Sequence, residues 1–171
     1  KDWSGVQLKT GKFPLLVATY NEPVRRQELI KPIKMIITPK GEKVIDFGQN
    51  MVGWVKIKVK GNAGDKITIQ HAEVLDKAGN FYTENLRAAK QENIYILRGG
   101  IAEIFEPHFT FQGFRYIKVE GYNGDLQPDD FTATALYSDM NPTGSFTSSN
   151  PLLNQLQSNI QWGQKGNFLD V

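Results

Sequence analysis

The sequence predicts an all-β fold, an antiparallel two-sheet β-sandwich of the jelly-roll kind with a short C-terminal α-helix. Three features predict it: apolar residues recur at every second position, turns rich in glycine and proline separate these runs, and helical periodicity is absent before residue 150. The runs correspond to about nine to eleven short strands. Such a series of strands is typical of two packed antiparallel sheets.

The composition is that of one globular domain without unusual charge. A chain of 171 residues with 40% hydrophobic content can bury a core without a metal or a disulfide. Its 20 basic and 18 acidic residues are spread along the sequence and give a net charge of +2. This pattern indicates neither a nucleic-acid patch nor a polybasic membrane anchor, so we expect no nucleic-acid and no membrane partner.

The absence of cysteine excludes disulfides, thiolate catalysis and cysteine–zinc clusters. Apolar runs fall short of the ~20 residues of a spanning helix, and residues 1–5 lack the apolar core of a secretory signal. The compartment stays open, with the periplasm or secretion favoured over the cytoplasm. Because the chain starts without Met and a new pattern begins near its end, we expect a piece of a longer polypeptide.

The N-terminal third is expected to supply a lead-in, two single strands and a hairpin. Residues 1–14 lack periodicity and are interpreted as an extended lead-in, anchored by Trp3 and Phe13, that covers a sheet edge. The elements that follow are a strand at 15–19, a polar edge strand at 24–30, and a hairpin of 33–38 with 43–47 around a proline–glycine turn.

The segment 46–54, with the sequence Asp-Phe-Gly-Gln-Asn-Met-Val-Gly-Trp, joins this hairpin to the next strand. We interpret it as a turn inside the sheet. Gly48 and Gly53 let the chain reverse or bulge, and they allow a neighbouring strand to approach closely. Trp54 is expected in the core.

Alternation continues from residue 55 to residue 137. The odd-numbered residues of 55–59 and of 67–71 are expected to face the core. Residues 76–80 predict a hairpin turn with Gly79 and Asn80 in left-handed backbone, followed by a long loop at 81–92. The remaining strands are expected at 93–97, 103–112 with an aromatic core face of Phe105, Pro107, Phe109 and Phe111, 114–120 and 131–137.

The period changes after residue 150. Asn150 suits a helix N-cap and Pro151 the first helical position, and apolar residues then recur at helical spacing until Gly163. The segment predicts a helix of about three turns. Its apolar stripe needs a partner surface, which is the sheet, another copy of the chain or a further domain. The stripe consists of Leu152, Leu153, Leu156 and Ile160.

Several of these segments together resemble the bacterial α-L-rhamnosidases. The concanavalin-like β-sandwich domain of that family is similar to residues 46–54, 71–75, 82–87 and 113–116, and the entry into its helical catalytic domain is similar to 144–146, 149–154 and 162–171. The resemblance implies a β-sandwich accessory domain at 1–143. It further implies that 144–171 is a linker and first helix towards a helical catalytic domain that this chain lacks.

Hydrolysis of a glycosidic bond needs two carboxyl groups on opposite sides of the bond. The carboxylates that stand out, Asp46, Glu73, Glu84 and Glu106, are scattered and form no such pair in the sequence. The resemblance agrees, since it implies an inverting glycoside hydrolase whose catalytic acids follow residue 171. We therefore assign no catalytic residue and expect the isolated chain to be inactive.

The sequence contains no motif for another kind of catalysis or for metal binding. His71 and His108 keep no metal-ligand spacing and are expected to be hydrogen-bonded sheet residues. A Gly-x-Ser-x-Gly nucleophile elbow is absent, and the turn at 76–80 has too few oxygen ligands for a calcium loop. We expect neither a cofactor nor a metal site.

Sugar binding is the alternative function. It needs an aromatic face and a few planar polar groups, which Tyr82, Glu84, Asn85 and Arg87 in the long loop can supply. The leading hypothesis is a non-catalytic domain whose partner is the catalytic domain of its own parent enzyme. The alternative is an independent carbohydrate-binding module for rhamnose-containing glycans. A purely structural sandwich also fits the strands, but it leaves the motif matches unexplained.

Overall fold

The computed structural model describes residues 4–169, so Trp3 lies outside the described residues. Eight strands, two short 3₁₀ helices and one α-helix occur in this range. The strands are β1 (Val24–Ile30), β2 (Lys34–Ile37), β3 (Lys43–Val59), β4 (Lys66–Ala72), β5 (Glu92–Ile96), β6 (Glu103–Phe105), β7 (Gln112–Glu120) and β8 (Phe131–Ser138). The helices are η1 (Glu84–Leu86), η2 (Pro128–Asp130) and α1 (Pro151–Asn167).

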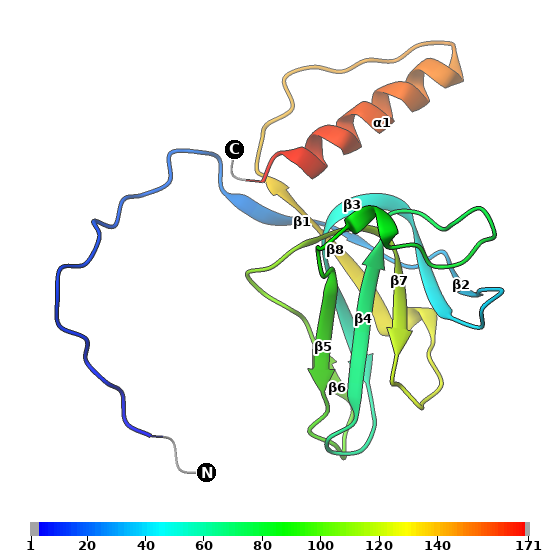
Figure 1. Cartoon of the computed structure of the whole chain (residues 1–171). Helices are drawn as coiled ribbons and strands as arrows, with labels where there is room; N and C mark the ends of the chain where they lie inside the picture. Colours follow the sequence, from blue (N-terminus) through cyan, green and yellow to red (C-terminus); the bar gives the residue numbers. More distant parts are fainter. Residues whose placement is uncertain (1–3, 170–171) are drawn as a thin grey trace.

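Antiparallel pairing joins the strands into one curled sheet with the order β1-β8-β3-β7-β4-β5, while β2 and β6 also pair with β3 (Figure 1). The strands form one continuous hydrogen-bonded sheet because β3 is 17 residues long and pairs with strands in two parts of it. Residues 43–46 of β3 pair with β2 and 44–53 with β7, while 53–57 pair with β8 and 57–59 with β6. The predicted all-β antiparallel architecture with a C-terminal helix is confirmed.

The core is built from alternate residues of the central strands. The odd-numbered residues of 55–59 and 67–71 are all at most 3% exposed, as their alternation predicts. Phe114 of β7 and Phe131 of β8 are completely buried beside them. Trp54 is also buried, but it lies on the opposite face of β3 and helps to form a surface groove described below.

The segment 46–54 is a bulge within β3 and not a turn. Asp46 pairs with Tyr116 and Met51 with Phe114, so five steps along β3 match two steps along β7. The residues in excess bulge out of the ladder, and Gly48 takes a positive φ of 77° there. A Cβ at Gly53 would lie 1.9 Å from the carbonyl oxygen of Thr134. The predicted close strand approach at Gly53 and the bulge allowed at Gly48 are therefore confirmed, whereas the predicted turn is wrong.

The strand predicted at 103–112 is mostly absent. β6 ends at Phe105, which pairs with Ile57 of β3, and the ladder resumes where Gln112 pairs with Gly53. Seven steps along this segment face only four along β3, so 106–111 loops outward. Phe109 consequently lies fully exposed and Phe111 is 55% exposed, so the predicted aromatic core face is wrong for both rings.

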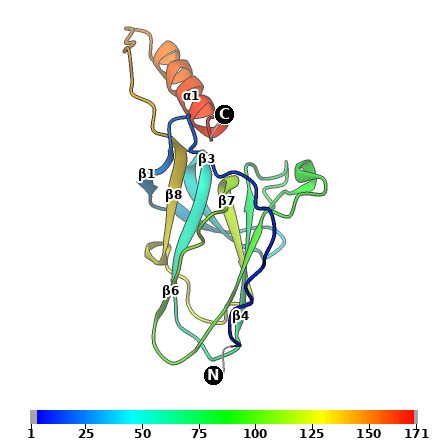
Figure 2. The same ribbon diagram turned by 90° about the vertical axis from the view of Figure 1, so that its left-hand side faces the viewer.

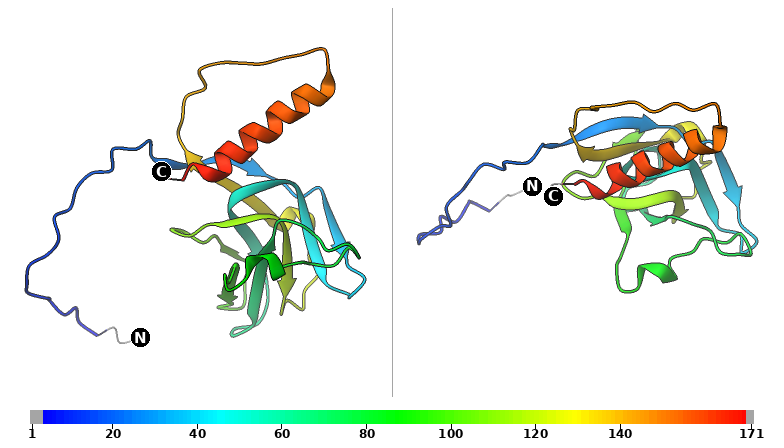
Figure 3. Two further views of the ribbon diagram at one scale, coloured as in Figure 1. Left: turned by 45° about the horizontal axis from the view of Figure 1, so that its top comes forward. Right: turned by 90° about the horizontal axis from the view of Figure 1, so that it is seen from above.

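The N-terminal residues form an extended arm, defined here as residues 4–23. Figures 1 and 3 show this arm leaving the sheet at the start of β1 and running away from it. Phe13 is 70% exposed and does not cover a sheet edge. Leu15–Thr19 forms no strand, because apolar residues make a strand only beside a pairing partner and the arm runs clear of the sheet.

α1 lies across one end of the sheet (Figures 1 and 3). The side chain of Asn150 caps it by accepting a hydrogen bond from the backbone N–H of Leu152 at 2.9 Å, as predicted. The helix continues past Gly163 to Asn167, because Trp162 packs on the core cluster and Gly166 lies against Val52. Within the described residues, no helix is long and apolar enough to cross a membrane.

The turn at 76–80 has the predicted glycine geometry. Gly79 has a φ of 83°, whereas Asn80 is not left-handed. The Asp76 carboxylate accepts hydrogen bonds from the backbone N–H groups of Ala78 and Asn80 at 2.9 and 2.8 Å. This carboxylate therefore closes the turn itself.

Candidate functional site

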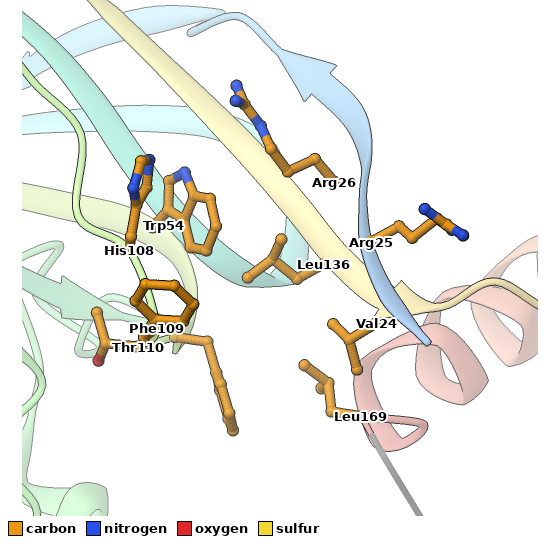
Figure 4. Close-up of a pocket in the computed structure, with 10 residues that line it drawn as sticks. Val24, Arg25, Arg26, Trp54, His108, Phe109, Thr110, Leu136 and Leu169 are labelled. Carbon is orange, nitrogen blue, oxygen red and sulfur yellow. The ribbon is translucent and has the colours of Figure 1, made fainter. Parts of the chain in front are cut away.

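The surface contains a groove of about 700 Å³, called here the Trp54 groove (Figure 4). Residues 24–26 of β1 form one wall and residues 108–111 form the other. Trp54 of β3 and Leu136 of β8 lie between the two walls, and Leu169 closes the end nearest α1. The groove is therefore mainly apolar and aromatic.

The floor of the groove is held by a polar network. The indole Nε1 of Trp54 donates a hydrogen bond to Oε1 of Glu106 at 2.9 Å. The same oxygen pairs with Nη2 of Arg26, also at 2.9 Å. Arg25 pairs with Asp139 at 2.8 Å. Both arginines that line the groove are thus paired with carboxylates, so the rest of its lining is mainly apolar.

The outer wall presents aromatic rings to solvent. His108 lies 5.7 Å from the Trp54 ring and 6.3 Å from the Phe109 ring, centroid to centroid. Phe109 has a φ of 58°, a left-handed conformation that a bulky residue rarely adopts. His108 belongs to this exposed loop, so its prediction as a sheet residue is wrong.

Two chain segments meet beside the groove at the end of β8. The backbone N–H of Ser138 donates to the carbonyl oxygen of Phe168 at 2.8 Å, and that of Asp139 donates to the carbonyl oxygen of Pro23 at 3.0 Å. Polypeptide entering at β1 and polypeptide leaving after α1 are therefore fixed at neighbouring positions.

A second contact fixes the C-terminal turn of α1 to the sheet. Nζ of Lys165 lies 2.6 Å from Oε1 of Glu28, and the Tyr137 hydroxyl donates to the same oxygen at 2.7 Å. The ammonium group also lies over the rings of Trp162 and Tyr137, at 4.4 and 4.9 Å from their centroids. The orientation of α1 relative to β1 and β8 is set by these contacts.

Asp46 of the bulge is a structural anion. Arg115 donates to both of its oxygens at 2.8 and 2.9 Å, and the backbone N–H of Gly48 donates at 2.7 Å. Burial alone would raise the pKa of Asp46, but these donors outweigh it and lower the pKa. A carboxylate that is ionised and fully bonded holds the bulge in place and is a poor general acid.

His71 is a neutral core residue within the sheet, as predicted. Its Nδ1 lies 3.1 Å from the carbonyl oxygen of Gln91 and therefore donates to it, while Nε2 is buried and makes no hydrogen bond. The ring lies 4.9 Å from that of Phe114. Burial lowers the pKa of His71 from 6.5 to about 4.

The four residues predicted for sugar binding share one exposed loop. Tyr82 is half-buried just before η1, Glu84 and Asn85 lie exposed on η1, and Arg87 follows it with a φ of 55°. Arg87 lines a pocket of about 180 Å³, whose lining includes none of the other three. The loop prediction is confirmed, whereas sugar binding stays a prediction.

The described carboxylates that stood out in the sequence do not form a hydrolytic pair. Asp46 is held by Arg115, Glu106 by Trp54 and Arg26, and Glu73 accepts a hydrogen bond from Asn50 at 3.2 Å. Glu84 lies on η1, in the separate loop. Within residues 4–169, no group of three or more acidic or histidine side chains is placed to hold a metal ion.

Sequence reasoning missed the Trp54 groove. It placed Phe109 and Phe111 in a core strand, because alternation cannot show that β3 offers too few pairing positions for them. The available signal was Pro107, which lacks an N–H for the ladder and sits before the exposed rings.

Comparison with known proteins identifies the relatives of this chain. Residues 36–137 match the family model of the bacterial alpha-L-rhamnosidase concanavalin-like domain. An alpha-L-rhamnosidase of Streptomyces avermitilis is 43% identical over 157 residues, which are 91% of this chain and 15% of that protein. One of Formosa agariphila is 39% identical over all of this chain and 19% of that protein.

The fold agrees with these relatives. The crystal structure of the Streptomyces avermitilis alpha-L-rhamnosidase complexed with L-rhamnose superposes with a TM-score of 0.86 and 42% identity, covering 91% of this chain and 15% of that one. The chain thus spans less than a fifth of the length of these curated relatives.

Proposed function

Because this chain belongs to the family of bacterial α-L-rhamnosidase concanavalin-like domains, we propose that it is the non-catalytic β-sandwich domain of a longer α-L-rhamnosidase. In that role it supports a helical catalytic domain, which removes terminal α-L-rhamnose from glycans or glycosides. Residues 1–143 are the accessory domain, and 144–171 are the linker and first helix towards the catalytic domain.

Two findings carry this proposal: the relatives are called alpha-L-rhamnosidase, and the chain matches only a small part of their length. Proteins called alpha-L-rhamnosidase match the chain at 39–43% identity over a segment that is only 15–19% of their length. The conclusion is strengthened by the carboxylates around the Trp54 groove and the bulge, which serve structural contacts.

The exposed stripe of α1 supports a docking role. Leu152, Leu153, Leu156 and Ile160 are between 45% and 77% exposed, although the helix is capped and fixed to the sheet at its other end. An ordered helix with an uncovered apolar stripe is typical of a surface that another folded unit covers.

The support function can be tested by removing this domain from the parent enzyme. We expect the catalytic remainder alone to unfold at a Tm at least about 5 °C lower, since a lost interface of a few kcal/mol shifts Tm by this amount. Circular dichroism measures both Tm values. An unchanged Tm and unchanged hydrolysis of an aryl α-L-rhamnoside by the remainder would contradict the proposal.

A further inference from the structure

The Trp54 groove has three properties that a chain folded only on itself does not require. Its wall holds the Phe109 ring fully exposed, on a backbone with φ at 58°. Its volume is about 700 Å³, and its lining is mainly apolar. Holding a bulky residue in left-handed backbone costs about 1–3 kcal/mol, and sites of that kind are concentrated where a protein binds something.

The arm leaves the sheet from the same wall of the groove. Val24 lines the groove, and the residues before it run outwards with large apolar side chains that are all at least 70% exposed: Val6, Leu8, Phe13, Leu15, Leu16, Val17 and Tyr20. In Figure 1 the arm and the segment 106–111 project to the same side, which is the side that faces the viewer in Figure 2. Two uncovered apolar surfaces therefore border one space.

The backbone directs further polypeptide to this space. Pro23 and Phe168 are bonded to adjacent residues at the end of β8, and Leu169 itself lines the groove. In relatives of which this chain matches only 15–19%, most of the polypeptide lies outside the matched segment, and under the proposed function the part that follows α1 would start at this position. The nearest body that can cover the groove is thus the next domain of the same chain.

We propose that the Trp54 groove is the seat for the domain that follows α1, with the rings of Phe109 and Phe111 inserted into an apolar hollow of that domain. The arm lies along the far side of the same body. This inference rests on the proposed function, because it takes the following domain to be the catalytic part of the parent enzyme. The seat is distinct from the α1 stripe, which lies on the N-terminal half of the helix.

The partner surface is expected to be apolar and not strongly charged. Figure 4 shows Arg26 extending towards Trp54 and His108 and Arg25 pointing away from the rings, and both are already paired, with Glu106 and Asp139 at 2.9 and 2.8 Å. A carboxylate on the partner would compete with these existing pairs and would gain little. Aliphatic or aromatic side chains instead bury the two phenylalanine rings without leaving an unpaired charge.

Hydrogen exchange tests the seat without any substitution. The amides of 108–111 are measured in the isolated chain and in the full-length parent enzyme under the same conditions. We expect exchange at least about tenfold slower in the full-length enzyme at these residues. Equal exchange rates in the two proteins would overturn the proposal, because a covered loop cannot exchange as freely as an open one.

Other occupants of the groove give different results in the isolated chain. If the arm folds back into the groove, 108–111 is protected in the isolated chain and loses protection when residues 1–20 are deleted. If a second copy occupies it, protection in the isolated chain rises with protein concentration. Either result contradicts the proposal.

A pair of variants of the full-length enzyme separates the seat from general destabilisation. Phe109→Ser with Phe111→Ser is expected to remove the protection at 108–111, while Ile96→Ser, which changes an apolar side chain of β5 that is 63% exposed, is expected to keep it. Hydrolysis of an aryl α-L-rhamnoside by the same full-length enzyme decides the proposed function separately. A wild-type full-length enzyme that is active but leaves 108–111 unprotected would refute the seat alone.

Discussion

Acidification is expected to destabilise this domain through His71. The ring is completely buried, its Nδ1–H donates to Gln91, and its Nε2 faces no hydrogen-bond acceptor. Adding a second proton would place a charge in the core beside Phe114. The folded protein therefore resists protonation, whereas the unfolded chain accepts the proton at an ordinary pKa.

The magnitude follows from the two pKa values. Because the pKa falls from 6.5 to about 4 on folding, the unfolded state binds more protons than the folded state between these values. Stability consequently rises with pH across this window and is fully present above pH 6.5. Between pH 7.5 and 5.0 the linkage relation gives a loss of about 2 kcal/mol in the free energy of unfolding.

Urea unfolding at pH 7.5 and pH 5.0 measures this loss. His71→Asn retains a donor for the Gln91 carbonyl but cannot titrate, so its unfolding free energy is expected to be nearly equal at both pH values. His108→Asn, which removes the exposed imidazole, is expected to keep the loss of about 2 kcal/mol. The lower pH stays above 4.5, the ordinary pKa of a glutamate such as Glu42, whose pKa is also lowered on folding. If His71→Asn loses as much stability as the wild type, the reasoning about His71 is wrong.

Three further outcomes are expected. Gly53→Ala should lower the free energy of urea unfolding by about 3 kcal/mol, because its Cβ would overlap the backbone oxygen of Thr134. Gly144→Ala, which adds a Cβ in open space, should change this free energy by no more than about 0.5 kcal/mol. Equal costs for the two variants would contradict the close approach at Gly53. Lys165→Met should lower the free energy of unfolding by about 0.5–1 kcal/mol at low salt, because it removes the ion pair with Glu28, and by less at about 1 M salt. A loss that does not depend on salt would show that the effect comes from packing. Calorimetric titration with millimolar rhamnose should give neither heat nor a Tm shift, and a clear rise in Tm would instead favour the carbohydrate-binding alternative.

Local patterns predicted most of the strands, and they did so most clearly where burial follows a period of two, as in β4 and in residues 55–59 of β3. β4 is the clearest case: Ile67, Ile69 and His71 alternate with polar residues, and the structure buries all three. The edge strand β1 and the N-cap Asn150 were also predicted, because a polar strand and a capping side chain are recognisable without knowledge of their neighbours.

The errors have a common physical origin in strand pairing. The length that a partner strand offers decides whether a segment stays in the ladder, and this length is a property of the whole sheet. Residues 106–111 loop out because β3 has too few pairing positions for them. Residues 47–50 bulge out of β3 because β7 has too few pairing positions opposite them. Neither count can be read from the segment itself.

The Trp54 groove was missed for the same reason. Trp54 was correctly expected to be buried, but the sequence could not show that Glu106 and Arg26, from distant segments, hold its indole at the base of a groove. The aromatic residues beyond Pro107 were therefore interpreted as core, although the structure places Phe109 in solvent.

The rate at which purified residues 1–171 hydrolyse a chromogenic aryl α-L-rhamnoside is the most direct test of the supporting role. We expect no release of the aryl group above the buffer rate, while the full-length parent enzyme at the same concentration cleaves the substrate. Turnover by the isolated chain that disappears on substitution of one of its own carboxylates would contradict the supporting role, because the catalytic groups would then lie within this domain.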